Sequence, residues 1–317
     1  MRQLLADLCD AWHRRCCSSA GPMRQYTIKK RVTLEGVGLH SGKQTKVTLS
    51  PAPEDTGIVF RAGDDRITAA PESVVNSHYA TTIGKNGTRV ATVEHLLAAA
   101  AGLGIDNLEV GVEGPEIPAM DGSAKPFVAL LAAAGRNQQS ARRRSLTLPN
   151  AIRVGSDGRW IHIFPAPAFR ISYTLDVDHP AIGTQVLSWA PATERSFVED
   201  VAPARTYGFL KDLGIMRKNG LARGGSLDNA VVLAKGGPLN GLRYRDEFVR
   251  HKILDLIGDL ALLGRPILAH VVARNGGHTL NVELVRAIQH ALGLARRPVG
   301  AALSVLPRVP APGLAAI

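Results

Sequence analysis

The first half of the chain alternates short stretches of β-forming residues with two Ala-rich stretches of helical spacing. These patterns predict strands at 47–49, 58–60 and 107–112 and helices at 92–101 and 124–134. The polar and basic segment that follows, residues 135–149, predicts a linker or a domain boundary.

The second half of the chain shows the same mixture of strand and helix patterns. Strands are expected at 151–154, 160–164, 170–177, 229–234 and 267–273, and helices at 247–263 and 280–294. Because strands and helices mix without a regular β–α–β repeat, the pattern favours the α+β class over a doubly wound parallel sheet. At roughly 100–200 residues per domain, the 317 residues predict two domains, which we place at 23–140 and 141–295.

Both ends of the chain differ from this body. Asp7 and Asp10 interrupt the apolar stretch of residues 4–12, which makes it a poor core for a signal peptide. Residues 1–22 are therefore expected to be a dispensable arm or an over-extended start, with an organelle-targeting segment as the alternative. Residues 296–317 are rich in Pro and Ala and contain no acidic residue, which predicts a loosely ordered tail.

The composition describes a globular chain with an excess of positive charge. Hydrophobic residues make up 45%, too many for a disordered protein, and no apolar run approaches the roughly 18 residues that cross a bilayer. With 38 Lys and Arg against 27 Asp and Glu, the net charge is +11, but the cations are scattered. Nucleic-acid-binding proteins usually cluster their cations among aromatic residues. We therefore expect no nucleic-acid partner, and the charge suits an anionic small substrate or an anionic membrane surface.

The sequence excludes several kinds of site. Its three cysteines, Cys9, Cys16 and Cys17, precede residue 18, so a metal in the body must be held by His, Asp or Glu. The glycines at 36–38 and 224–225 match neither the dinucleotide-binding fingerprint nor the phosphate-binding loop. No Gly-x-Ser-x-Gly elbow is present either. ATP, NAD and serine-nucleophile chemistry therefore have no support in the sequence.

The strongest local signal is a polar stripe on the helix expected at 247–263. His251, Asp255 and Asp259 are four residues apart and share one face, while Ile and Leu fill most of the remaining circumference. Ionisable groups on a mostly buried helix need partners, because burying an unpaired charge is costly. A zinc ion would satisfy an imidazole and a carboxylate at this spacing. A surface stripe with a helical His–Asp pair is the alternative, and the spacing alone favours it.

Glu94 and His95 form a second signal at the start of the helix expected at 92–101. Adjacent Glu and His residues place a base and a ligand at one metal in other zinc hydrolase motifs, although such a pair is more often a polar helix start. With His251 and Asp255, His95 completes two histidines and a carboxylate. Three such ligands are typical of catalytic zinc and leave one position for water. Glu94 then remains as a candidate base.

A third signal is His278, which follows Gly276 and Gly277 at the end of an expected strand. Glycine permits backbone geometry that could present the imidazole into a cleft, and a solvent-exposed turn histidine is the alternative. Asp259 could accept a hydrogen bond from this imidazole and raise its pKa, so that it stays protonated.

Taken together, these motifs resemble those of the UDP-3-O-acyl-N-acetylglucosamine deacetylases, zinc amidases of lipid A biosynthesis. The matching segments are GVGLHSG at 36–42, TVEHL at 92–96, GLGIDN at 102–107, EIPAMDGS at 116–123, ARTYGF at 204–209, GGS at 224–226, the run at 241–259 and GH at 277–278. The resemblance covers about residues 24–291. It implies two domains of similar α+β architecture, each with helices stacked on a β-sheet, and an active site between them.

The resemblance also implies the residues of the reaction centre. The family's zinc ligands fall on His95, His251 and Asp255. Its general base, which deprotonates the zinc-bound water, falls on Glu94. Its acid, which protonates the leaving amine, falls on His278.

Four further positions carry supporting roles in the family. Asp259 matches the carboxylate that orients and charges the acidic histidine. Thr206 matches the hydroxyl that stabilises the oxyanion together with zinc, and Lys252 matches a cation that contacts the substrate. Tyr207 stands where many members have Phe, which keeps the ring and adds a hydroxyl near the site.

The family's second domain contains an insert that forms an apolar passage for the substrate's acyl chain. Here the insert falls at about 208–225. Its candidate substrate-binding residues, with the adjacent Tyr207, are Phe209, Leu210, Leu213 and Met216, beside the apolar Ile215 and Leu221. An acyl chain gains about 0.8 kcal/mol per buried CH₂, so such a passage would supply much of the binding energy. Ordinary packing of the insert is the alternative for these residues.

The implied activity is zinc-dependent removal of the N-acetyl group of UDP-3-O-acyl-N-acetylglucosamine, which releases acetate. We expect a cytoplasmic monomer that contacts the inner-membrane surface transiently. Iron could occupy the same nitrogen and oxygen ligands. Two alternatives remain: a basic, non-enzymatic protein that binds RNA or membrane surfaces, and a zinc amidase that acts on another acylated amide.

Overall fold

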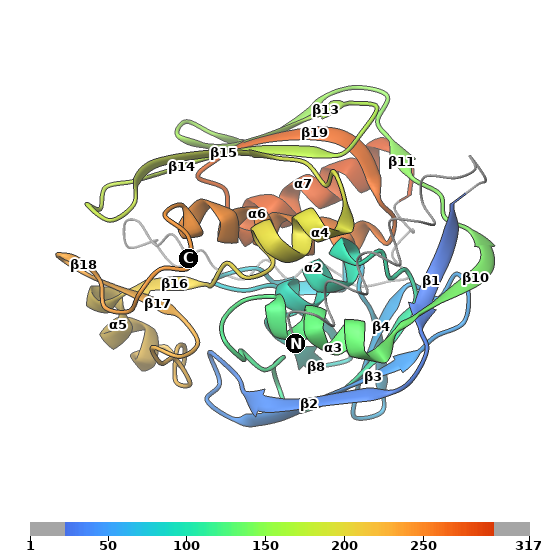
Figure 1. Cartoon of the computed structure of the whole chain (residues 1–317), viewed down its shortest axis with the longest axis horizontal. Coiled ribbons are helices and arrows are strands. Elements are labelled where there is room, and N and C mark those ends of the chain that lie inside the picture. The colour runs from blue at the N-terminus through green and yellow to red at the C-terminus, as the bar shows by residue number, and fades with distance from the viewer. Residues whose placement is uncertain (1–22, 295–317) are drawn as a thin grey trace.

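The computed structural model describes residues 23–294 and confirms the α+β class. Figure 1 shows two sheets on opposite sides of the molecule with the main helices stacked between them, and a small lobe at one edge. The expectations for residues 1–22 and 296–317 lie outside the described residues.

The first sheet is built from the first half of the chain. Its strand order is β2 (Val32–Val37), β3 (Gln44–Pro51), β9 (Leu108–Glu113), β4 (Ile58–Ala62) and β5 (Asp65–Thr68). The central strand β9 runs antiparallel to β3 and parallel to β4, and the outer pairs are antiparallel. Alternate residues of β3, such as Val47 and Leu49, are fully buried, because successive side chains of a strand point to opposite faces.

The second sheet is built from the second half of the chain. Its strand order is β12 (Ile152–Ser156), β13 (Arg159–Pro165), β19 (Ile267–Arg274), β14 (Arg170–Val177) and β15 (Gly183–Trp189), and β11 (Leu146–Thr147) pairs with the start of β19. The central strand β19 runs antiparallel to β13 and parallel to β14. The sequence pattern missed β15, an edge strand in which the apolar Val186 is exposed and the polar Gln185 is less exposed, so that the apolar pattern does not follow burial.

The two sheets share one topology. In each half, the four outer strands come first in sequence and are followed by a helix, the central strand and a second helix. These helices are α2 (Glu94–Gly102) and α3 (Lys125–Ala134) in the first half, and α6 (Glu247–Leu260) and α7 (His278–Ala291) in the second. The halves therefore repeat each other in structure, although the sequence contains no repeat of fixed period.

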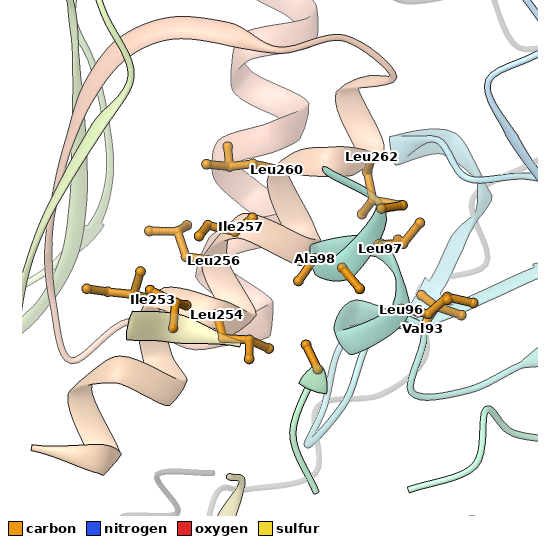
Figure 2. Close-up of a cluster of buried hydrophobic side chains, with 14 of the residues drawn as sticks. Val93, Leu96, Leu97, Ala98, Ile253, Leu254, Leu256, Ile257, Leu260 and Leu262 are labelled. Carbon is orange, nitrogen blue, oxygen red and sulfur yellow. The ribbon is translucent and has the colours of Figure 1, made fainter. Parts of the chain in front are cut away.

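Helices α2 and α6 pack directly against each other at the centre of the molecule. Figure 2 shows Ala98 on the side of α2 that faces α6, while Leu96 lies on the side away from α6; both are buried. They belong to one hydrophobic core that extends through both sheets. The halves are thus held together by apolar burial.

Gly258 sets how closely the two helices approach. A Cβ at this position would lie 2.1 Å from the carbonyl oxygen of Glu94, the first residue of α2. No other residue type fits that gap without moving backbone. This contact brings the start of α2 against the last turn of α6.

The segment expected as a linker or a domain boundary, residues 135–149, contains two strands, β10 and β11. Residues Arg136–Arg142 form β10, which pairs antiparallel with β1 (Arg24–Ile28) in a two-stranded ribbon. Its polar side chains have partners in the first half: Gln139 donates to the Ala52 carbonyl at 3.0 Å and accepts from Asn107 at 2.8 Å. The polar composition therefore belongs to a surface strand, and the boundary expected between residues 140 and 141 falls inside β10.

The small lobe, which we define as residues 207–240, contains the expected insert. It consists of β16 (Tyr207–Phe209), the 3₁₀-helix η3 (Leu210–Asp212), α5 (Leu213–Lys218), β17 (Val231–Ala234) and β18 (Gly237–Pro238). Its sheet has the order β16-β17-β18, and Figure 1 shows the lobe at the left edge of the two-sheet body.

The remaining elements are short. They are the three-stranded sheet of β6 (Val74–Asn76), β7 (Thr82–Lys85) and β8 (Thr88–Val90), the helices η1 (Pro71–Ser73), α4 (Glu194–Ser196) and η4 (Ala261–Leu263), and the π-helix η2 (Phe197–Val201).

The expected helices agree with α2, α3, α6 and α7 to within a few residues at their ends. Among the helices of residues 23–294, none is both long and apolar enough to span a membrane.

The Gly258 contact gives a stability prediction. Gly258→Ala should lower the free energy of unfolding by about 1–3 kcal/mol, because the added methyl group forces α2 and α6 apart. Urea unfolding would measure the loss. Gly214→Ala in α5 is the matched control, since its Cβ meets nothing within 4 Å, and it should leave stability unchanged or slightly raised. Equal stability of the two variants would contradict the role of Gly258.

Candidate metal centre and active site

A cavity lies where the starts of α2 and α7 meet the middle of α6. Its lining residues are Leu39, His40, Tyr79, Thr92, Glu94, His95, Thr206, His251, Asp255 and His278. Six of the ten, from both halves of the chain, are residues that the sequence singled out. The fold therefore completes in space a site that neither half contains alone.

Three of these side chains form a group that could hold a metal ion. The ligand atoms of His95, His251 and Asp255 all lie within 4.8 Å of one another. Oδ1 of Asp255 is 3.3 Å from Nε2 of His251 and 3.6 Å from Nε2 of His95. Two imidazoles and a carboxylate around one point suit a divalent metal.

The unsatisfied oxygen of Asp255 supports this assignment. Its Oδ1 atom is buried and, within residues 23–294, accepts no hydrogen bond. Its Oδ2 atom accepts a hydrogen bond from Nζ of Lys252 at 3.1 Å. A buried carboxylate oxygen without a partner is costly, and a bound cation would remove that cost. The residues present therefore fit a metal.

Asp255 is held in its ionised form. Burial by itself raises the pKa of a carboxyl group, but the interactions with His251, Lys252 and His278 outweigh it and hold the pKa of Asp255 well below its ordinary value. The same ion pair raises the pKa of Lys252 against the opposing effect of burial. Lys252 thus stays charged beside the cluster.

His251 is held as a neutral ligand. Its Nδ1 lies 3.1 Å from the carbonyl oxygen of Ala204 and can donate a hydrogen bond to it, which leaves the Nε2 lone pair free for a metal. Complete burial is the main reason that the pKa of His251 falls to about 3. The imidazole is therefore unprotonated at neutral pH, as metal binding requires.

Glu94 faces the same cavity from the first turn of α2. Its side chain is buried, and Oε2 accepts a hydrogen bond from the backbone N–H of Thr81 at 3.0 Å. Burial is the main reason that its pKa is raised, and Asp259 and Asp255 add to the shift. A carboxylate with a raised pKa beside a metal site is well suited to accept a proton.

His278 is the first residue of α7 and lies opposite Glu94. Its Nδ1 is 2.8 Å from Oδ2 of Asp259, and its Nε2 is 3.8 Å from Oε1 of Glu94. Burial lowers the pKa of His278, but Asp259, Glu94 and Asp255 outweigh it and raise the pKa to about 10. The imidazolium can therefore donate a proton from Nε2 into the cavity.

Asp259 is anchored on both oxygens. Oδ2 also accepts from the Asn281 amide at 2.8 Å, and Oδ1 accepts from the hydroxyl of Thr81. Thr81 thus contacts two carboxylates, Glu94 through its N–H and Asp259 through its hydroxyl. No sequence motif had marked Thr81 or Asn281, because each acts through packing between distant elements.

The other expected site residues take different positions. Thr206 lines the cavity, and its backbone is tied to Gly122 and Val231 by hydrogen bonds of 2.8 Å. Tyr207 is buried, with its ring 5.0 Å from that of Phe248 and 5.5 Å from Nζ of Lys252. Tyr207 is therefore not part of the cavity lining, and its ring faces the ammonium group of Lys252.

The insert residues are divided between the inside and the surface of the lobe. Phe209 and Met216 are buried, Leu213 is half-buried and Leu210 is exposed. The cavity described above includes none of these four side chains. The acyl passage that the resemblance implies stays a prediction.

Comparison with known proteins agrees with this geometry. A family model described as UDP-3-O-acyl N-acetylglycosamine deacetylase matches residues 25–290. A protein of Oleidesulfovibrio alaskensis named UDP-3-O-acyl-N-acetylglucosamine deacetylase is 50% identical over 272 residues, which cover 84% of this chain and 89% of the relative. A protein of the same name from Myxococcus xanthus is 48% identical over 270 residues, 83% of this chain and 86% of the relative. The chain therefore belongs to the UDP-3-O-acyl N-acetylglycosamine deacetylase family.

Proposed function

We propose that this protein hydrolyses the N-acetyl amide of UDP-3-O-acyl-N-acetylglucosamine to give UDP-3-O-acyl-glucosamine and acetate, the committed step of lipid A biosynthesis. One observation carries the proposal: a buried His95–His251–Asp255 cluster lies beside Glu94, whose pKa is raised, and the protonated His278, whose Nε2 is 3.8 Å from Oε1 of Glu94. Family membership and the names of the relatives support the same substrate. Because the substrate is a nucleotide sugar, we place the reaction in the cytoplasm, with the protein acting as a monomer.

Zinc is the metal that we propose for the cluster. Two histidines and one carboxylate form a ligand set of catalytic zinc, although the same nitrogen and oxygen atoms also suit iron. The metal, when bound, supplies a Lewis acid that polarises the amide carbonyl and makes water more acidic.

The side chains of this protein supply the proton transfers. Glu94 accepts a proton from the attacking water, since burial has raised its pKa towards the working range. His278 donates its Nε2 proton to the leaving amine, and Asp259 orients the ring through Nδ1. Glu94 and His278 thus divide the two tasks that amide hydrolysis needs, a base and an acid.

Charge that develops on the carbonyl oxygen needs donors that are already in place. Thr206 is the proposed hydroxyl donor, because it lines the cavity on a backbone that is tied at both its N–H and its carbonyl. Lys252 adds a buried positive charge beside Asp255 and is the proposed contact for the anionic substrate.

Two substitutions separate metal binding from proton transfer. His251→Ala should remove most of the bound metal, whereas Glu94→Gln should keep the metal and lower kcat by about 100-fold or more, because a positioned base is lost. Metal analysis of the purified proteins and an acetate-release assay would measure both effects.

The controls for that pair are His290→Ala and Glu35→Gln, both at exposed positions away from the cavity. Both control variants should keep metal and turnover. Undiminished turnover in Glu94→Gln would exclude Glu94 as the base, and unchanged metal content in His251→Ala would remove that residue from the ligand set.

The acyl chain of the substrate provides a second test. If part of the chain is buried in the lobe, each CH₂ contributes about 0.8 kcal/mol, so four methylene groups correspond to about 3 kcal/mol and to more than 100-fold in kcat/KM. We therefore expect the substrate without its acyl chain to lose at least about 100-fold. Equal kcat/KM for the two substrates would favour an amidase that acts on another acylated amide.

The lobe also suggests contact with a lipid surface. Half of the large hydrophobic side chains that are strongly exposed in residues 23–294 lie in it, namely Leu210, Ile215, Leu227 and Leu239. The lobe carries five cations and two acidic residues, and its cations form no ion pair with any residue in the described part of the chain. Exposed apolar side chains beside cations that form no ion pair suit a membrane with anionic headgroups.

Vesicle binding tests this contact. The protein should co-sediment with vesicles that contain phosphatidylglycerol and bind phosphatidylcholine vesicles less, because the cations attract anionic headgroups. Leu210→Ser and Ile215→Ser should weaken binding several-fold. Val186→Ser is the control, since that residue is 69% exposed on β15 of the second sheet, outside the lobe. Equal binding by all three variants would argue against the lobe as the contact surface.

A further inference from the structure

A buried carboxylate outside the catalytic group, Glu116, holds two walls of the cavity together. It lies in the Pro- and Gly-rich segment between β9 and α3 and is 1% exposed. Among residues 23–294 it forms no ion pair with Lys or Arg. A buried carboxylate without a cation must be satisfied by hydrogen bonds.

Those hydrogen bonds all come from residues at or beside the cavity. Oε1 of Glu116 accepts from the backbone N–H of His40 at 3.0 Å and from the hydroxyl of Thr92 at 2.8 Å. Oε2 accepts from the backbone N–H of Ser41 at 2.8 Å. A Cβ on Gly38 would lie 2.3 Å from Oε2, so glycine is required for this loop to approach the carboxylate.

Thr92, the third partner, has an unusual backbone. Its φ of +58° is in the left-handed region, which a β-branched residue adopts only at an energetic cost. Thr92 is 4% exposed and lies two residues before Glu94 and three before His95. The conformation of Thr92 therefore sets the direction in which α2 begins.

The segment of Glu116 is itself anchored to the strand that leads into Thr92. Residues Ala91 and Glu116 form a β-bridge, and the N–H of Ile117 donates to the Ala91 carbonyl at 3.0 Å. Thr45 donates its hydroxyl to the Glu116 carbonyl at 2.7 Å. The carboxylate is thus presented from a fixed backbone.

We infer that Glu116 is a positioning residue that keeps Thr92 in its left-handed conformation, so that Glu94 and His95 point into the cavity, and that it holds the loop of His40, another lining residue, in place. The Thr92 hydroxyl is the link: its hydrogen bond to Oε1 offsets the cost of the positive φ. The catalytic consequence rests on the proposed function, whereas the effect on metal binding does not.

The substitution Thr92→Gly distinguishes a positioning role of Glu116 from a general loss of packing around it. Glu116→Gln should lower kcat by about 10–100-fold and weaken metal affinity, as the loss of a supporting contact does. Because glycine adopts positive φ without strain, adding Thr92→Gly to Glu116→Gln should restore at least about fivefold of the lost kcat. Glu113→Gln, an exposed glutamate three residues earlier, is the matched control and should behave as the unsubstituted protein.

Substitutions at Thr92 alone keep the test valid if Glu116→Gln does not fold. Thr92→Val has the same shape without the hydroxyl and should lose at least about tenfold in kcat, whereas Thr92→Ser keeps the hydroxyl and should stay within about threefold. The inference is overturned if Thr92→Val and Thr92→Ser behave alike, or if adding Thr92→Gly to Glu116→Gln restores no activity. If the unsubstituted protein releases no acetate, the proposed function fails, and the metal affinities of the same variants still decide the role of Glu116.

Discussion

The close contact between α2 and α6 is the constraint on which the rest of the structure depends. Gly258 lets α6 approach the carbonyl of Glu94 where a methyl group would not fit. One half of the chain supplies Glu94 and His95, and the other supplies His251 and Asp255. The apolar residues around the contact stabilise it, so the energy that holds the two halves together also assembles the site.

Burial then determines the chemistry of the site. The same low-dielectric surroundings keep His251 neutral and raise the pKa of Glu94. Asp259 and its neighbours have the opposite effect on His278, which they keep protonated. Two groups that would titrate within a few pH units of each other in water are thereby separated into a base and an acid. This separation requires that water be excluded, which the packing of α2, α6 and α7 provides.

The sequence predicted the main helices, most strands of both sheets and the α+β class, because the apolar periodicity of these elements is strong. It failed where polar residues form strands. Part of the segment expected as a linker or boundary forms β10, whose polar side chains find partners in the first half, such as Gln139 with Asn107 just before β9. The edge strand β15 was missed for a related reason: its burial alternates, but the apolar Val186 is on the exposed face and the polar Gln185 on the less exposed one. The sequence also provided no indication that the two sheets share one topology, because the two halves show no repeat of fixed period.

The sequence by itself determined the chemistry that is available: no cysteine in the body, a His–x₃–Asp–x₃–Asp stripe and a Glu–His pair, whose resemblance to one family pointed to a metal-dependent deacetylase. Only the tertiary structure decided which polar residues meet. The hydroxyl of Thr81 donates a hydrogen bond to Asp259, which lies 178 positions later in the sequence. Glu116 accepts one from the backbone N–H of His40, which lies 76 positions earlier. Such contacts carry no local pattern, because they arise where elements from distant parts of the chain pack together and bury polar atoms that must then find partners.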